Sequence, residues 1–165
     1  MSERTNRTQQ ILDPTTGGVP DAIERSIEID APVERVWTLV SEPGWFINGG
    51  QIVEHVIERV DDEVVVVHDA SVGRFQIRTL RLDPPSYAAF RWEAGRKLDD
   101  EPYDGPTTLV EFFVTERPGG STLRVVESGF AAWGEDAIAR RKAFDENAEG
   151  WALELGEAKR VLEGR

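Results

Sequence analysis

Residues 110–130 read VEFFVTERPGGSTLRVVESGF, and this stretch predicts a β-hairpin. On both sides of Arg117-Pro118-Gly119-Gly120, apolar residues alternate with polar ones, as a half-buried strand requires. A proline early in the four residues and a glycine late are typical of a tight turn. We therefore expect antiparallel strands at about 107–116 and 121–129, joined by this turn.

Alternation also predicts which side chains of this hairpin are buried together. Glu127 would share a face with apolar residues, and a carboxylate buried there needs an ion-pair or hydrogen-bond partner to offset its desolvation. Arg78 and His55 are the partners we consider. In the alternative interpretation the register shifts near Gly129, and Glu127 lies in water at the rim of the sheet. Counted back from Phe130, the common face holds Val110, Phe112, Val114, Leu123, Val125 and Glu127.

The segment before the hairpin predicts a strand, two short helices and more strands. Alternation begins at Ala22 and predicts a first strand. Pro32 can begin a helix, and apolar residues at Val33, Val36, Trp37 and Val40 follow with helical spacing. Trp45-Phe46-Ile47 predicts a brief second helical turn. Further strands are expected at about 51–60, 63–69, 74–82 and 86–93.

The C-terminal segment, about 135–163, changes to a helical period and predicts one long amphipathic helix. Gly150 and Gly156 lie inside it and predict a bend or a close backbone contact. Residues 1–20 carry few large apolar groups and are expected to form a flexible tail. The buried stripe of the helix is expected to contain Phe144, Ala148, Trp151, Leu155, Ala158 and Leu162.

The predicted order of elements is an α+β plan with the helices on one side of an antiparallel sheet. This order resembles the START-like helix-grip (SRPBCC) superfamily, and within it the bacterial Hsp90-ATPase-activator-like family. The resemblance implies one ligand-binding domain over residues 21–165, with a curved sheet of about six to seven strands wrapped around the long C-terminal helix and two short helices after the first strand. It is carried by IDAPVERVWTLVSEPGWF (29–46), LDPPSYAAFRW (82–92), VEFFVTERPGGSTLRVVESGF (110–130) and GWALELGEAKRVLE (150–163).

The same resemblance implies a hydrophobic cavity between the sheet and the C-terminal helix. We expect it to bind a small apolar or amphipathic molecule, lipid-like or polyketide-like, without catalysis, a metal or a cofactor. Large rings suit such a lining, although the same rings could pack into a solid core instead. The expected ligand-binding residues are Trp45, Phe46, Arg78, Trp92, Phe112, Glu127, Phe130 and Trp151.

Two other functions fit the resemblance. One is a polyketide cyclase- or aromatase-like enzyme, in which a buried Glu127 with a raised pKa would act as acid or base. The other is a protein-interaction module that regulates the ATPase of a Hsp90-type chaperone. The eukaryotic activators carry a separate N-terminal domain before this one, where this sequence has a short tail.

Composition limits the partners, metal sites and cellular location that we expect. The charge of the 165 residues is 19 minus 31, or −12, which disfavours nucleic acid and anionic membranes as partners. There is no cysteine, and the histidines His55 and His68 fall in different predicted strands without metal-ligand spacing. No signal peptide or membrane-spanning run is evident, so we expect a cytoplasmic protein. Two interactions are still considered: binding of a protein partner, and formation of a homodimer through an exposed apolar patch at Trp133.

Overall fold

The computed structural model describes residues 18–96, 103–134 and 136–164 of the chain. Most of the predicted tail lies outside these residues. Of its last three residues, 18–20, Val19 is buried and belongs to the hydrophobic core.

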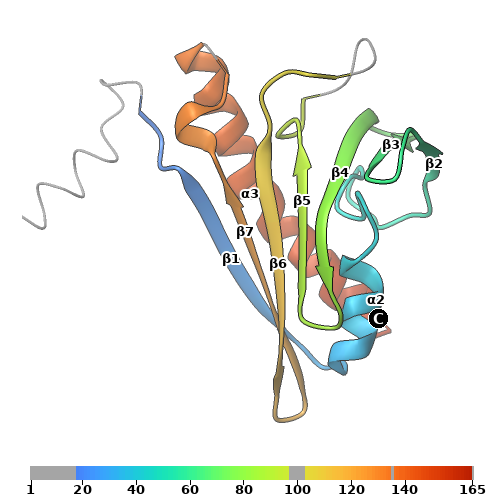
Figure 1. The fold of residues 1–165 in the computed structure, drawn as a ribbon. Coiled ribbons are helices and arrows are strands. Elements are labelled where there is room, and N and C mark those ends of the chain that lie inside the picture. The colour runs from blue at the N-terminus through green and yellow to red at the C-terminus, as the bar shows by residue number, and fades with distance from the viewer. Residues whose placement is uncertain (1–17, 97–102, 135, 165) are drawn as a thin grey trace, which may run out of the picture.

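Within this part of the chain, seven strands form one antiparallel sheet in the order β1-β7-β6-β5-β4-β3-β2 (Figure 1). From β2 to β7, neighbouring strands in the sheet are consecutive in the sequence, and β1 pairs with β7 at one edge of the sheet. The strands are β1 (Ala22–Ile29), β2 (Val56–Arg59), β3 (Val64–Asp69), β4 (Gly73–Asp83), β5 (Tyr87–Trp92), β6 (Thr108–Arg117) and β7 (Gly120–Ser128).

The β6–β7 hairpin confirms the prediction made from residues 110–130. Its register pairs Val110 with Glu127 and Phe112 with Val125, so these side chains share one face. All four are completely buried. The prediction that Glu127 lies on the apolar face is therefore confirmed, and the alternative position at a wet rim is wrong.

Strand β2 is shorter than the predicted 51–60. In the register of the β2–β3 pair, Val56 lies opposite His68, and β3 ends one residue later, at Asp69. In the same register His55 would lie opposite Asp69, so residues 51–54 extend past the end of β3 and have no residue of that strand opposite them.

Two α-helices and one short 3-10 helix accompany the sheet in the described ranges. Helix α2 (Val33–Val40) follows β1 as predicted. The second short helix expected at Trp45-Phe46-Ile47 is instead a pair of hydrogen-bonded turns, in which the N–H of Trp45 binds the carbonyl of Glu42 at 3.3 Å and that of Ile47 binds Gly44 at 2.9 Å. Gly44 has φ +76°, which ends helical geometry there. The 3-10 helix η2 (Phe130–Ala132) follows β7.

Helix α3 (Ala137–Leu162) lies along one face of the sheet (Figure 1). Asp136 begins it by accepting a hydrogen bond from the N–H of Ile138 at 2.8 Å. The close backbone contact considered at Gly150 and Gly156 is absent, because a Cβ built at either position meets nothing within 4 Å among the described residues. The buried stripe agrees with the predicted period and includes Trp151, Leu155, Ala158 and Leu162.

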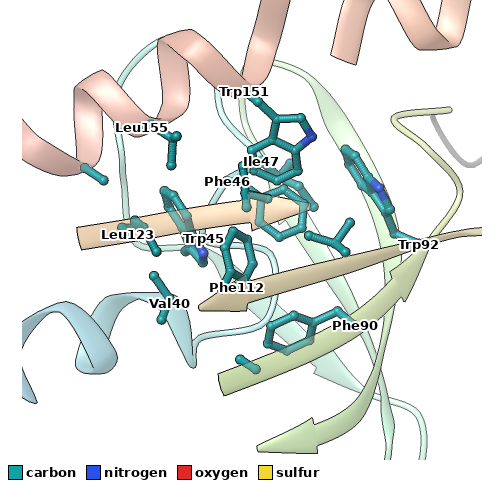
Figure 2. Packing of buried hydrophobic residues seen from close by; sticks show 14 of the residues in the cluster. Val40, Trp45, Phe46, Ile47, Phe90, Trp92, Phe112, Leu123, Trp151 and Leu155 are labelled. Carbon is teal, nitrogen blue, oxygen red and sulfur yellow. The ribbon is translucent and has the colours of Figure 1, made fainter. Parts of the chain in front are cut away.

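The core fills the space between α3 and the sheet with large side chains (Figure 2). Rings of Trp45, Phe46 and Trp151 gather there, over the strand residues Phe90 and Phe112. No helix in the described part of the chain combines the length and the apolar character needed to cross a membrane.

Candidate functional site

Glu127 is the centre of a buried hydrogen-bond network that joins α3 to the sheet. Its side chain is 0% exposed. The indole N–H groups of Trp92 and Trp151 donate to Oε2 at 2.7 Å and to Oε1 at 2.8 Å. The hydroxyl of Thr108 donates to Oε2 at 2.5 Å, and the amide of Asn147 lies 3.1 Å from Oε1 and 3.2 Å from Oε2. The network thus joins the ends of β5, β6 and β7 to the middle of α3.

The hydrogen-bond donors around Glu127 are all neutral. Burial raises the pKa of Glu127, and the hydrogen bonds from its four partners act in the opposite direction. The predicted partners are wrong: Arg78 pairs with Glu63 at 2.8 Å, and His55 pairs with Asp69 at 2.9 Å. Alternation explains the error at Arg78, which lies on the opposite face from the buried β4 residues.

Aromatic rings occupy the space where the resemblance implies a central cavity. The ring centroid of Phe46 lies 5.0 Å from those of both Trp92 and Trp151, 5.8 Å from Phe112 and 5.9 Å from Trp45. Figure 2 shows Trp151 reaching from α3 toward these rings. Such spacings are those of packed aromatic side chains, so the middle of the domain is a filled core.

The structure brings six of the eight predicted site residues together and separates the other two. Phe130 is buried, but its ring packs against Phe144 at 5.3 Å, away from the Phe46 cluster. Arg78 is exposed on the far face of the sheet. The six residues that lie together are Trp45, Phe46, Trp92, Phe112, Glu127 and Trp151.

A pocket of about 440 Å³ lies beside the N-terminal half of α3, and we call it the large pocket. Trp133 is 6% exposed and lines it, so the predicted exposed apolar patch at Trp133 is wrong. The lining consists of the segment after β5, the residue that ends η2 and one face of α3: Ala94, Gly95, Arg96, Trp133, Ala139, Lys142, Ala143, Glu146 and Asn147.

A second pocket of about 90 Å³, the small pocket, follows farther along the same helix. Three aromatic side chains and one carboxylate contribute to it. Glu154 accepts a hydrogen bond from the side-chain amide of Asn48 at 2.7 Å. Burial raises the pKa of Glu154 to about 7, and the negative charges of Glu157 and Asp69 add to that rise, against the hydrogen bond from Asn48. The lining residues are Phe46, Trp92, Asn147, Gly150, Trp151 and Glu154.

Both pockets follow one helical stripe of α3. The helix residues that line them are separated by three, one, three, one, three, one and three positions, which keeps them on one side of the helix. Asn147 belongs to both pockets and also binds Glu127. Sequence reasoning missed this stripe, although a polar Asn147 and a small Gly150 beside the apolar stripe were its signal. The residues are Ala139, Lys142, Ala143, Glu146, Asn147, Gly150, Trp151 and Glu154.

Glu93, directly after β5, is a second completely buried residue with a carboxyl group. Its Oε2 accepts a hydrogen bond from the backbone N–H of Gln76 at 2.9 Å, while Oε1 has no partner among the described residues. Burial raises the pKa of Glu93 to about 7. In the described ranges, no three His, Asp or Glu side chains are grouped as a metal site would require.

Solved structures with similar folds come from several bacteria. Protein MLL2253 of Mesorhizobium loti matches with a TM-score of 0.64 and 17% identity over 87% of this chain and 97% of its own. The Aha1 dimer of Colwellia psychrerythraea matches at 0.58 and 17%, over 86% and 96%. DynU16, from the dynemicin biosynthetic locus, matches at 0.62 and 21%, over 87% of this chain and 48% of that longer chain.

The sequence itself matches no family model and no curated protein. The structural matches, at identities this low, concern the fold. The seven-stranded antiparallel sheet, the short helix after β1 and the long C-terminal helix match those of helix-grip proteins, and this chain has that fold.

Proposed function

We propose that this protein binds a small amphipathic molecule in the groove formed by the large and small pockets along α3. The observation that carries the proposal is the stripe of α3 residues that lines both pockets. Asn147 belongs to both linings. The volume of the large pocket, about 440 Å³, falls in the range of small-molecule sites, roughly 300–1,000 Å³.

The lining suits a ligand with an apolar body and a polar group. Trp133, Ala139 and Ala143 offer apolar surface, whereas Lys142 and Glu146 are exposed and charged. Binding would remove apolar surface of both partners from water. This location differs from the central cavity that the resemblance implies, because rings fill that space.

Gly150 allows a direct test, because it lines the groove and has room for a side chain. Leucine at this position would place its side chain in the small pocket without a backbone clash. Gly156 is the matched control: it lies in the same helix, is equally free of neighbours within 4 Å, and lines neither pocket. Both substitutions replace glycine with a better helix former.

The experiment is a titration of each variant with 1-octanol, followed by tryptophan fluorescence. Trp133, Trp92 and Trp151 line the groove and report its occupancy. We expect saturable binding by the wild type and Gly156→Leu, and a loss of at least about tenfold in affinity for Gly150→Leu. Equal binding by all three proteins would show that octanol sits elsewhere and would refute the location.

An enzymatic role is the less favoured alternative. DynU16 belongs to a biosynthetic locus, and its similar fold supports cyclase-like chemistry only as an analogy. Glu127 is not among the described residues that line the two pockets. It is hydrogen-bonded to Asn147, which does line them. A group that cannot touch the ligand is poorly placed as an acid or base.

Relationship to the Hsp90-ATPase-activator-like family is also part of the proposal. The similarity to Aha1 of Colwellia psychrerythraea supports it at the level of the fold. A chaperone or a second copy of the chain would bind an outer surface, whereas the groove described above has the dimensions of a small ligand. The small-molecule function therefore has the stronger structural support.

A further inference from the structure

Building on the proposed function, which leaves the ligand's polar group open, we propose that the small pocket binds an organic ammonium group. The apolar part of the same ligand would then extend along α3 into the large pocket. The proposal concerns the chemical class of the ligand, an amphiphile with a positively charged nitrogen.

Aromatic side chains form most of the small pocket's wall. Phe46, Trp92 and Trp151 all line it, with the Phe46 ring centred 5.0 Å from each indole. Both indole N–H groups are bound to Glu127, so the polar edges of the rings are already occupied. The three aromatic residues line the pocket, and the negative face of an aromatic ring attracts a cation.

Glu154 supplies the opposite charge in the same pocket. One of its oxygens binds Asn48, and in the described part of the chain the other oxygen has no hydrogen bond. No basic side chain is among the residues that line the small pocket. A bound ammonium group would provide the cation that the surrounding protein does not.

Other negative charges near Glu154 also favour a cation in the small pocket. Glu157 on the same helix and Asp69 on β3 both act on Glu154 as negative charges. His55 pairs with Asp69, and Arg160 pairs with Glu157. An anionic group in the small pocket would be repelled, and a neutral group would gain no charge interaction.

Size restricts the small pocket to one chemical group. At about 90 Å³ it is far smaller than a whole small-molecule site. Asn147 lines both pockets, and Gly150, which lines the small one, has no side chain that would narrow it. This arrangement suits an ammonium headgroup followed by an alkyl chain.

The test compares three probes that share an octyl chain: octyltrimethylammonium, 1-octanol and octanoate. At about pH 8.5, we expect the wild type to bind the ammonium probe at least about tenfold more tightly than either other probe. Glu154→Gln keeps an oxygen for Asn48 and removes the charge. It should lose most of that preference and bind the ammonium probe and octanol with similar affinities, while Glu149→Gln on the exposed side of α3 should behave as wild type.

The pH dependence provides a second readout. A cation favours the ionised carboxylate, so affinity for octyltrimethylammonium should rise as the pH increases through about 7, the pKa of Glu154. In Glu154→Gln this rise should disappear, although Asp69, His55 and Glu157 are still present. Urea unfolding of both variants confirms that they are folded.

The possible results separate this inference from the proposed function. Suppose that the wild type binds octanol or octanoate as tightly as the ammonium probe or more tightly, and that Gly150→Leu still blocks this binding. The groove would then remain the ligand site, but the ammonium specificity would be overturned. A preference for the ammonium probe that survives in Glu154→Gln would also overturn it. Failure of all three probes to bind would reject the proposed function, and the inference with it.

Discussion

The substitution Glu93→Gln should change how the stability of this protein depends on pH. The carboxyl group of Glu93 is 0% exposed, and its Oε1 has no partner among the described residues. Burial raises its pKa from 4.5 to about 7. Because the unfolded chain releases this proton near pH 4.5 and the folded chain only near 7, stability falls as the pH rises between these values. The difference corresponds to about 3 kcal/mol.

Glutamine has nearly the same shape and removes this dependence. Its oxygen can accept the hydrogen bond from the backbone N–H of Gln76, and its amide nitrogen takes the place of the unpartnered Oε1. The free energy of unfolding of the variant minus that of the wild type should therefore grow by about 2–3 kcal/mol between about pH 5 and about pH 8.5. The titrations of Glu127 and Glu154 occur in both proteins and cancel in the difference.

The assay is urea unfolding followed by tryptophan fluorescence at four pH values across that range. Glu149→Gln is the control, because it removes an exposed carboxylate from α3. It should give a nearly constant difference from the wild type. A difference for Glu93→Gln that does not change with pH would refute the claim that the buried charge destabilises the folded protein.

Two further substitutions test the hydrogen-bond network and the hairpin. Glu127→Gln should lower the free energy of unfolding, measured in urea at about pH 6, by about 1–3 kcal/mol. The reason is that the new amide nitrogen must face an N–H group of Trp92 or Trp151. Wild-type stability of this variant would contradict the assigned network. Gly120→Ala should cost more than about 2 kcal/mol, since its Cβ would lie 2.2 Å from the carbonyl oxygen of Ile29. Gly119→Ala is the control, because Gly119 has φ +83° and open space around it, and it should cost only about 1–2 kcal/mol. Equal losses of stability for the two glycine variants in thermal unfolding would disprove the steric argument.

Local patterns in the sequence were sufficient to predict most of the fold. In the β6–β7 hairpin, alternation and the Pro118-Gly119-Gly120 turn set the register, so the burial of Glu127 followed from counting. Helix α3 was equally predictable from its period. The errors occurred where pairing depends on a distant partner. Residues 51–54 are an example, because β3 ends at Asp69 and has no residue opposite them.

The candidate site could be predicted only in part, because it depends on how α3 is rotated against the sheet. Glu127 binds residues 19 to 35 positions away in the sequence, and nothing local identifies Asn147 as one of them. The aromatic residues were expected to surround a cavity, but whether rings enclose space or fill it depends on distances between elements. Gly150 was recognised as unusual in a helix, yet only the structure places it in a groove.

Whether the groove along α3 holds a ligand can be measured by native mass spectrometry of the protein as purified from cells, with Gly150→Leu and Gly156→Leu prepared alongside. We expect the wild type and Gly156→Leu to carry, or to take up from the octyl probes, one small amphipathic molecule per chain. Gly150→Leu should give the bare protein mass. A bare mass for all three proteins after incubation with the probes, or an equal adduct on all three, would contradict a ligand site in the groove along α3.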